Sequence, residues 1–277
     1  MSLRRSTIVI FVAAIALLAL MARRPGLPGT SAADMKDVPA ASSAPDTAST
    51  PVLVELFTSE GCSSCPPADA LLSLLGRTQP VRGANIIVLE EHVDYWDRLG
   101  WKDPFSSETA TERQNEYGAA FGGSQVYTPQ MIVDGRTEFV GSSDTDALRA
   151  IRAASQAQKP AIQLSWENGE NLAIHLEPLN NTAGRDGQQM ILVIAENMLH
   201  SDVKRGENAG RALEHNGVVR QILPLAKIDA APAGFTSSVA VHTAREWNRA
   251  NLRAVVFVQE RRSRHVLAAA AIPFPKV

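Results

Sequence analysis

The sequence predicts an α/β amino-terminal domain followed by a mainly antiparallel, sandwich-like β domain. Apolar runs rich in β-branched residues at 52–57 and 86–89 are typical of buried strands, and the leucine-rich segment 68–76 between them has helical spacing. Strand, helix and strand in this order indicate a parallel pair joined by a crossover. From 162 to 176, apolar and polar residues alternate on both sides of an Asn-Gly turn, which is typical of an antiparallel hairpin. The fold class is therefore expected to change near residue 158.

The other segments fit a division into two domains, residues 51–158 and residues 159–277. In the first domain we expect a Ser-capped helix at 106–122, a hairpin at 131–140 and a second capped helix at 142–156. In the second domain we expect five more strands, at 190–197, 217–225, 237–243, 252–260 and 266–272.

The amino terminus has the features of a targeting segment. Arg4 and Arg5 precede an apolar stretch at 8–22, which suits a secretory signal better than a spanning helix of about 20 residues. We expect residues 1–33 to be a signal peptide or an uncleaved membrane anchor, and residues 34–50 to be a disordered linker. The remainder is then periplasmic or secreted, with the alternative of a tether to the inner membrane through the apolar stretch.

The composition of the chain limits the classes of function that are compatible with it. The chain has 277 residues, a hydrophobic fraction of 45% and a formal net charge of -2. Because no strong basic field is present, nucleic acid is not expected as a partner. The chain has only two cysteines, and a location outside the cytoplasm would allow a disulfide between them to persist.

The two cysteines, Cys62 and Cys65, form a Cys-x-x-Cys motif between the first strand and the first helix. A helix amino terminus stabilises a thiolate, and thiolates attack disulfides. We expect Cys62 to be the nucleophile and Cys65 the resolving thiol, with no diffusible cofactor. Two local features oppose each other: Pro66 can delay the helix start and weaken its effect on Cys62, whereas the hydroxyls of Ser63 and Ser64 can donate to a thiolate.

The chain resembles the thioredoxin superfamily at a second point, the Thr128-Pro129 pair before a predicted strand. The resemblance implies that this proline is cis, faces the cysteines and aligns an extended substrate chain. Glu55 in the first strand resembles the buried acid that accepts a proton from the resolving thiol, although it lies one residue further from the cysteines than is usual. The resemblance therefore adds Thr128, Pro129 and Glu55 to the catalytic residues.

The segment after the second strand supplies a candidate binding surface. Its aromatic and charged residues leave the same sheet edge as the cysteine loop, and His92 can act there as an acid or a base. The alternative is that the aromatic residues close a small core and that His92 is hydrogen-bonded inside it. The expected substrate-binding residues are His92, Asp94, Tyr95, Trp96, Tyr127 and Gln130.

Several motifs together resemble one family of secreted bacterial proteins, known as domain of unknown function 1223. They are FTSEGCSSCPPAD, HVDYWDRLGWKDPFSS, RQNEY, YTPQMIVDG and ALEHNGVVR. The resemblance covers the chain from about Pro51 to its end and implies a thioredoxin-like amino-terminal half, with a redox role by analogy alone. It also places several polar residues with the cysteine loop, namely Arg113, Gln114, Tyr117, Tyr127, Thr128, Pro129 and Gln130.

The β-rich part holds one further polar segment, residues 207–220. It contains Asn208, Arg211, His215 and Arg220, which offer contacts to a substrate or to the first domain. We favour turn formation and a hydrogen-bond network between the domains over substrate contact.

Three functions are compatible with these motifs. We expect a thiol–disulfide oxidoreductase that acts on thiols or disulfides of other extracytoplasmic proteins. The first alternative is a non-enzymatic binding module in which the disulfide is fixed. The second is a copper-handling protein with Cys62, Cys65 and His92 as ligands. A zinc site is not expected, because zinc usually takes four ligands and only two cysteines are present.

Overall fold

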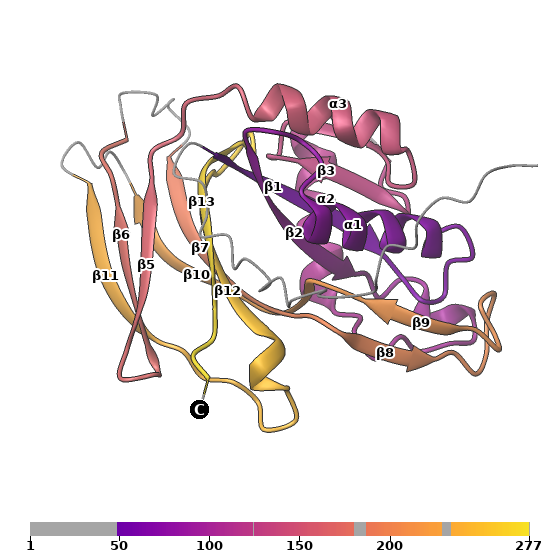
Figure 1. Ribbon diagram of the computed structural model, residues 1–277. Coiled ribbons are helices and arrows are strands. Elements are labelled where there is room, and N and C mark those ends of the chain that lie inside the picture. Colours follow the sequence, from indigo (N-terminus) through magenta and orange to yellow (C-terminus); the bar gives the residue numbers. More distant parts are fainter. Residues whose placement is uncertain (1–48, 124, 180–186, 229–233, 277) are drawn as a thin grey trace, which may run out of the picture. The chain divides into compact units, whose positions relative to one another are not determined.

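The computed structural model describes residues 49–123, 125–179, 187–228 and 234–276 (Figure 1). These residues belong to one compact unit that extends from Ser43 to Val277. The predicted signal peptide or anchor at 1–33 lies outside the described residues, as does the predicted linker up to residue 48. In the described part of the chain, no helix is both long and apolar enough to cross a membrane.

One large mixed sheet of eight strands contains most of the core. Its strand order is β13-β12-β7-β10-β2-β1-β3-β4. The strands are β1 (Thr50–Thr58), β2 (Ala84–His92), β3 (Gln130–Val133), β4 (Thr137–Val140), β7 (Gln188–Glu196), β10 (Val218–Ile228), β12 (Leu252–Glu260) and β13 (Val266–Pro273). β1 and β2 are parallel neighbours, as the strand–helix–strand order predicts. β2 also pairs in parallel with β10, through Glu90 and Val218.

The prediction of a thioredoxin-like α/β domain at the amino terminus is wrong. Strands make up 42% of the described residues and helices 20%, and strands from before and after residue 158 share the one large sheet. Four strands of the second half, β7, β10, β12 and β13, therefore complete this sheet, so the second half does not form a domain of its own. The physical reason is that hydrophobic periodicity identifies a buried strand but not its neighbours in the sheet. Nothing local in β2 indicates that β10, more than 100 residues later, pairs with it.

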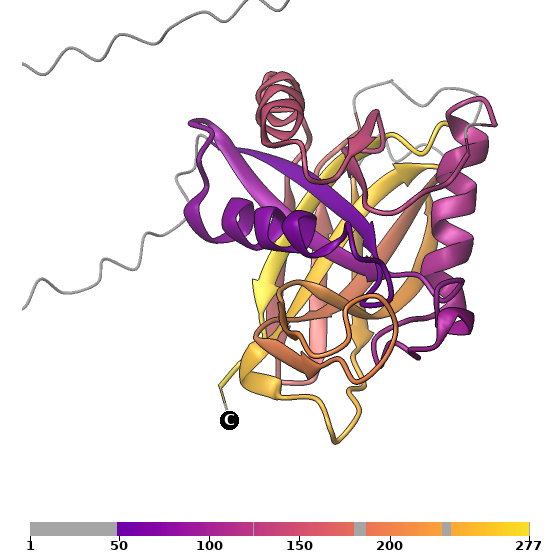
Figure 2. The same ribbon diagram turned by 90° about the vertical axis from the view of Figure 1, so that its right-hand side faces the viewer.

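Helices cover both faces of the sheet at the end formed by β1 to β4 (Figure 2). They are α1 (Pro66–Thr78), α2 (Glu108–Ala120) and α3 (Asp144–Ala154), with two short 3-10 helices, η1 (Asp97–Leu99) and η2 (Arg249–Asn251). Successive side chains of β1 point to opposite faces. Val54 packs with Leu72 of α1 on one face, and Phe57 packs with Tyr117 of α2 on the other. Ser107 caps α2 by accepting a hydrogen bond from the backbone of Ala110, as the sequence predicts.

A three-stranded sheet packs against the large sheet and shares its apolar core. Its strands are β5 (Ile162–Glu167), β6 (Asn171–Leu176) and β11 (Phe235–Ala240), in the order β11-β6-β5. β5 and β6 form the antiparallel hairpin predicted at 162–176. Leu172 of β6 belongs to the same buried cluster as Met190 of β7 and Val256 of β12.

A separate hairpin brings the second half of the chain to the start of α1. It consists of β8 (Leu199–Asp202) and β9 (Ala212–His215), and Figure 1 shows it beside α1. The amide of Asn216 donates to the hydroxyl of Ser73 in α1 at 2.7 Å. The segment between β8 and β9, residues 203–211, thereby lies against the cysteine loop.

Candidate functional site

The cysteine loop connects the end of β1 to the start of α1, and Cys62 and Cys65 form a disulfide with their Cα atoms 5.4 Å apart. α1 begins at Pro66, so Cys65 is its N-cap and Cys62 stands outside the helix. Pro66 and Pro67 have no N–H group, and the next two N–H groups of α1 donate to the carbonyl of Cys65. The helix start therefore directs none of its first N–H groups at Cys62.

The disulfide is buried but lies directly beneath the surface. Both cysteines have 0% exposure, whereas Ser63 and Ser64 between them are exposed. Asn208 covers the loop by donating its amide hydrogens to the carbonyls of Glu60 at 2.8 Å and Cys62 at 2.9 Å. The carboxylate of the neighbouring Glu207 accepts from the N–H of Ser63 at 3.0 Å. One short segment, 203–211, thus supplies these contacts over the oxidised pair.

Thr128 and Pro129 are joined by a cis peptide bond, as the resemblance implied. The indole N–H of Trp96 donates to the hydroxyl of Thr128 at 2.8 Å, and the Cβ of Trp96 lies 3.2 Å from where a side chain on Gly61 would begin. Trp96 therefore connects Thr128 to the cysteine loop. On the other side, Pro129 packs near the first turn of α1, at the position of Gly141.

Glu55 does not serve the cysteines in the way the sequence suggested. Its carboxylate pairs with the guanidinium of Arg113 at 2.5 Å and accepts a hydrogen bond from the hydroxyl of Tyr117. Arg113 also contacts Glu91 at 3.2 Å and Gln259 at 3.2 Å. We call Glu55, Glu91, Arg113, Tyr117 and Gln259 the arginine network. Glu55 is thus held by a cation and is not an open proton acceptor.

Electrostatics within the arginine network favour a charged Arg113 and a protonated Glu91. Burial and the adjacent Glu55 raise the pKa of Glu91 well above its usual value, although Arg113 acts in the opposite direction. Burial alone would lower the pKa of Arg113, but Glu55, Tyr117 and Glu91 raise it above its usual value. Burial therefore favours the neutral form of Glu91, while Arg113 bonds to both carboxyls.

Asp69, a buried acid close to the disulfide along the chain, was missed by sequence reasoning. Asp69 follows Cys65 by four residues in α1, so the two side chains share one helix face. It is 5% exposed and accepts a hydrogen bond from the hydroxyl of Thr58 at 2.6 Å. Burial and the carboxylate of Glu90 raise the pKa of Asp69 to about 7. The spacing of four within CPPAD could have identified it.

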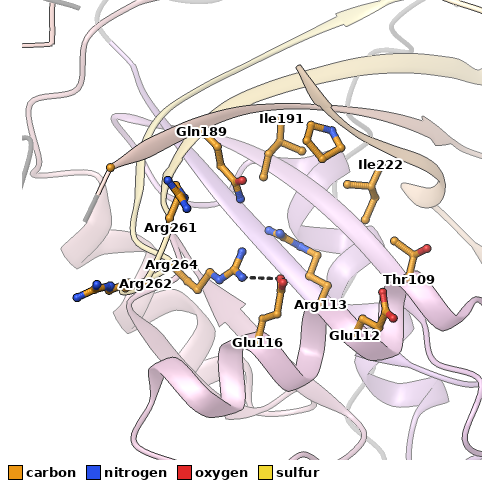
Figure 3. Close-up of a pocket in the computed structure, with 12 residues that line it drawn as sticks. Thr109, Glu112, Arg113, Glu116, Gln189, Ile191, Ile222, Arg261, Arg262 and Arg264 are labelled. Atoms are coloured by element: carbon orange, nitrogen blue, oxygen red, sulfur yellow. Dashed lines mark ion pairs between the residues drawn. The ribbon is translucent and has the colours of Figure 1, made fainter. Parts of the chain in front are cut away.

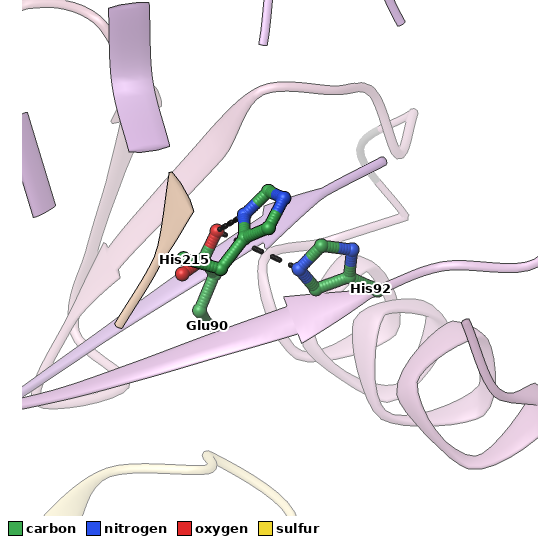
Figure 4. A group of neighbouring side chains, drawn as sticks. All are labelled: Glu90, His92 and His215. Atoms are coloured by element: carbon green, nitrogen blue, oxygen red, sulfur yellow. Dashed lines mark hydrogen bonds and ion pairs between the residues drawn. The ribbon is translucent and has the colours of Figure 1, made fainter. Parts of the chain in front are cut away.

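Beneath the cysteine loop lies a second buried group, which we call the histidine cluster: Glu60, Glu90, His92, Asp103 and His215. All are at most 2% exposed. His92 Nδ1 lies 2.7 Å from Asp103, and His215 Nδ1 lies 2.6 Å from Glu90. Glu90 also lies 3.5 Å from Nε2 of His92, and Glu60 lies 3.3 Å from Nε2 of His215. Figure 4 shows both imidazole rings beside the carboxylate of Glu90.

The carboxylates of this cluster favour protonated imidazoles. Burial opposes a charge on His215, but Glu90 and Glu60 outweigh it and raise its pKa to about 9. His92 is likewise raised well above its usual pKa, against burial, by Asp103 and Glu90. Burial would raise the pKa of Glu90, but His215 and His92 lower it to about 2. The cluster therefore holds several charges away from water.

The other predicted substrate-binding residues are divided among different contacts. Tyr95 donates to the amide oxygen of Gln114 at 3.2 Å, and that amide nitrogen donates to Gln130 at 2.9 Å. The carbonyl of Tyr127 accepts from the same amide at 2.8 Å. Asp94 instead accepts from the hydroxyl of Thr111 at 2.6 Å.

The expected site therefore separates into two groups. The residues bonded through Gln114 form a network of their own, while His92 belongs to the histidine cluster, hydrogen-bonded inside a core as the alternative interpretation proposed. The copper ligand set of Cys62, Cys65 and His92 is not assembled, since both sulfur atoms are bonded to each other.

Of the polar residues at 207–220, two are internal. Asn208 and His215 are 0% and 1% exposed and contact the cysteine loop and the histidine cluster. Arg211 is exposed. The guanidinium of Arg220 lies over the rings of Phe105 and Trp247. The hydrogen-bond network that we favoured for this segment is present.

A cavity of about 670 Å³ lies between α2 and strands β7 and β10. Figure 3 shows Arg113, Arg261 and Arg264 around it, with Arg264 paired to Glu116 at 2.8 Å. Because Arg113 is held by Glu55 and Arg264 by Glu116, these two cations are already compensated. The cavity is not continuous with any contact of the cysteine loop given above.

Comparison with known proteins identifies a family and a shared fold. The model of the family described as "Protein of unknown function (DUF1223)" matches residues 53–259. An X-ray crystal structure of a protein from Agrobacterium tumefaciens is 24% identical with a TM-score of 0.66, covering 83% of this chain and 96% of that one. HBP35 of Porphyromonas gingivalis is 13% identical with a TM-score of 0.61, covering 83% and 76%. At these identities the likeness concerns the fold alone. No curated protein matches the chain.

Proposed function

The chain belongs to the DUF1223 family, whose function is unknown, and we propose that it exchanges thiols and disulfides with other extracytoplasmic proteins through Cys62 and Cys65. The observation that carries this proposal is the position of the disulfide at the start of α1, directly beneath exposed Ser63 and Ser64, with the carboxyl of Asp69 one helical turn away. The proposed location, periplasmic or secreted, rests on the targeting features of residues 1–33.

The disulfide contributes too little as a staple for that to be its whole role. A cross-link stabilises a protein mainly by restricting the unfolded chain, and the effect grows with loop length. The two cysteines are separated by three positions, and such a loop yields about 2 kcal/mol, against about 3 kcal/mol for a loop of fifteen residues. Both ends of the cysteine loop are also fixed by β1 and α1, which are packed in the core.

The exchange reaction from the oxidised protein conserves atoms and electrons. A thiolate of a substrate dithiol attacks the sulfur of Cys62, which forms a mixed disulfide and releases Cys65 as a thiolate. The second substrate thiolate then attacks the substrate sulfur and releases Cys62. The substrate loses two electrons and two protons, and the protein becomes a dithiol. In the reverse direction Cys62 attacks a substrate disulfide and Cys65 resolves the intermediate.

Asp69 supplies the proton transfer that this scheme requires. Its carboxyl shares a helix face with Cys65, and its pKa of about 7 allows it to give or take a proton near neutral pH. Glu55, the acid expected from the sequence, cannot replace it because Arg113 holds that carboxylate.

Residues 203–211, which lie over the disulfide, determine when exchange occurs. Both sulfur atoms are sealed in the oxidised protein, so a substrate reaches Cys62 only after residues 203–211 have moved away. Two hydrogen bonds from Asn208 hold this segment, and the contact of Glu207 with Ser63 is exposed and weak. We therefore propose a slow, substrate-gated reaction.

A trapping experiment tests this function. In the full chain, Cys65→Ala leaves Cys62 without its resolving partner, so mixed disulfides with substrate proteins should accumulate and be identified by non-reducing electrophoresis and mass spectrometry. Cys62→Ala is the matched control, because its remaining cysteine sits at the N-cap and should capture far less. If Cys65→Ala captures no more than the variant without cysteines, the exchange function is wrong.

One observation favours a second candidate, a binding module with a fixed disulfide. The sulfur atoms are fully buried, and Pro66 and Pro67 deprive the helix start of donors for a Cys62 thiolate. This candidate predicts that the variant without cysteines keeps its partner-binding function and loses about 2 kcal/mol of unfolding free energy. Denaturant unfolding measures the second effect, and trapping separates the two candidates.

A further inference from the structure

The histidine cluster has an arrangement that neither thiol exchange nor a fixed disulfide requires. Glu90 and His92 stand two apart in β2 and point to the same face of the sheet, and β9 brings His215 against them. One ligand atom from each of these three residues lies within 4.8 Å of the others. The two imidazole rings approach to 4.8 Å between their centres.

Several polar atoms of the cluster have no hydrogen-bond partner although water cannot reach them. They are Nε2 of His92, Nε2 of His215 and Oε1 of Glu60, three of only eight such side-chain atoms among the described residues. These atoms instead form long ion pairs, Nε2 of His92 with Glu90 at 3.5 Å and Nε2 of His215 with Oε1 of Glu60 at 3.3 Å, and buried polar atoms held this loosely are costly. Once the imidazole protons leave, Nε2 of His92 can bind a cation beside Glu90, and so can Nδ1 of His215, the ring nitrogen that faces Glu90.

Charge points to a cation as well. The side chains gathered here include four carboxyls, those of Glu60, Asp69, Glu90 and Asp103. In the part of the chain that the structure describes, the ion pairs of these carboxyls come from His92 and His215 and from no lysine or arginine. A divalent ion that displaces the protons of the two imidazoles keeps this positive charge in place and bonds it directly to the carboxylate and imidazole atoms.

We propose that Glu90, His92 and His215 bind one divalent transition-metal ion, and that this ion is zinc. Imidazole nitrogen and carboxylate oxygen are the ligands zinc takes alongside thiolate. In a tetrahedral zinc site with bonds of about 2.0–2.1 Å, two ligand atoms lie about 3.3 Å apart. The separation of 3.5 Å between Nε2 of His92 and Oε1 of Glu90 is close to that value. Glu60 lies 3.3 Å from Nε2 of His215, the ring nitrogen that does not face Glu90, and helps to orient that ring.

Asp103 is a positioning residue for this site. Its carboxylate holds Nδ1 of His92 at 2.7 Å, which directs Nε2 toward Glu90. A carboxylate behind a ligating histidine is the usual arrangement at zinc sites, where it fixes the ring and its tautomer. The same carboxylate oxygen accepts the backbone N–H of Glu60 at 2.8 Å, so Asp103 orients two members of the cluster.

The zinc site stands apart from the disulfide chemistically, although Glu60 precedes Cys62 by two residues. No sulfur atom belongs to the proposed ligand set, and the disulfide would remain intact with the ion bound. Zinc binding and thiol exchange can therefore succeed or fail independently.

Zinc titration of the full chain tests the proposal. The protein is freed of metal with a chelator and titrated with zinc chloride by calorimetry, and mass spectrometry of the bound metal gives the stoichiometry. We expect one zinc ion per chain. His92→Gln and His215→Gln should each lower the affinity at least about 100-fold, and Asp103→Asn should lower it about 10–100-fold.

Two control variants show where the ion binds. His200→Gln removes an exposed histidine that pairs with Asp202 at 3.4 Å, and it should leave the zinc affinity unchanged. A Cys62→Ser, Cys65→Ser double variant should also bind zinc as the unaltered chain does, which distinguishes this site from a thiolate site. Circular dichroism establishes that each variant is folded.

Two results would contradict the proposed zinc site. If the unaltered chain binds no stoichiometric zinc, the proposal fails whatever the variants do. It also fails if folded His92→Gln and His215→Gln chains bind zinc as tightly as the unaltered chain. If either variant does not fold, the visible absorption spectrum of the unaltered chain with bound cobalt decides. A ligand set without thiolate gives no sulfur-to-cobalt charge-transfer band.

Discussion

β2 carries two buried polar networks on its opposite faces, and they differ in how their charges are balanced. Glu91 belongs to the arginine network, in which one guanidinium faces Glu55 at 2.5 Å and is bonded on several sides. Glu90 and His92, its neighbours in sequence, belong to the histidine cluster, in which no arginine or lysine of the described residues pairs with a carboxylate. Glu90, Glu91 and His92 are consecutive in β2, yet they belong to two separate networks on its opposite faces.

The difference distinguishes a structural network from a candidate site. In the arginine network one guanidinium bonds to both carboxyls, and Arg113 connects α2 to β1, β2 and β12. In the histidine cluster the carboxyls outnumber the imidazoles, and Nε2 of each imidazole meets a carboxylate only at 3.3–3.5 Å. A protein keeps such an imbalance where a ligand, a proton or a reaction uses it. Burial alone therefore does not distinguish a candidate functional site from a structural network, whereas incomplete compensation of buried charges does.

Arg113→Met tests the arginine network and should have the largest effect. The substitution leaves the carboxylate of Glu55 buried without its cation, so the unfolding free energy should fall by about 3–5 kcal/mol. Urea unfolding near pH 7 measures the loss. The double variant Glu55→Gln, Arg113→Met should recover part of it, because no buried charge then remains. A loss below about 1 kcal/mol would mean that the network is not a structural ion pair.

The pH dependence of stability tests the carboxyl excess on the other face. Burial and Glu90 raise the pKa of Asp69 from 3.8 to about 7, so the folded chain holds a proton that the unfolded chain releases between these values. Stability due to this group is present at low pH and is lost as pH rises through 7. From pH 5 to pH 8 the loss should be about 2–3 kcal/mol.

Asp69→Asn should remove that part of the pH dependence, while its amide oxygen can still accept the hydrogen bond of Thr58. Urea unfolding in the presence of a chelator, at pH 5, 6, 7 and 8, provides the comparison. Asp202→Asn, at an exposed position, is the control and should keep the slope of the unaltered chain. Equal slopes for Asp69→Asn and the unaltered chain would contradict the raised pKa.

Local signals in the sequence identified the elements around the cysteines. The parallel pair of β1 and β2 and the cap at Ser107 follow from short patterns of residue type, whereas the cis bond before Pro129 was implied by the family resemblance. The family motifs also identified DUF1223 correctly. What these patterns could not reveal is the sheet itself, because the pairing of Glu90 with Val218 joins segments that are 128 positions apart.

The site was only partly predictable for the same reason. Cys62, Cys65 and His92 are visible as motif residues, but His215 joins His92 only because β9 folds back against β2. Counting cysteines alone left histidine and glutamate out of the search for zinc ligands, although both residue types bind zinc. Glu55 was assigned to the cysteines by its place in β1, and the partner that holds it, Arg113, comes from α2.

Zinc-dependent stability separates the two networks directly. At free zinc 100 times above its dissociation constant, the folded chain should gain about 2.7 kcal/mol, because the unfolded chain does not assemble the site. His215→Gln should lose this gain, whereas Gln259→Ala, in the arginine network, should keep it. Thermal unfolding with and without zinc measures the gain. A gain that survives His215→Gln would place the ion elsewhere.

Asn208→Ala should have the smallest effect on stability and the most specific effect on chemistry. It leaves the carbonyls of Glu60 and Cys62 without donors, so unfolding should require about 1–3 kcal/mol less. Because the cover is loosened, reduction of the disulfide by dithiothreitol should accelerate about tenfold for each 1.4 kcal/mol by which opening becomes easier. Alkylation followed by mass spectrometry measures the rate.

Gln259→Ala is the matched control for that rate, because it removes a buried amide that bonds to Tyr117 at 2.8 Å on the opposite face of β2. Both variants should lose a similar amount of stability, but only Asn208→Ala should be reduced faster, since global unfolding is too rare to expose the disulfide in a stable chain. Equal acceleration in both would mean that reduction follows global unfolding. The segment at 203–211 would then not control access to the disulfide.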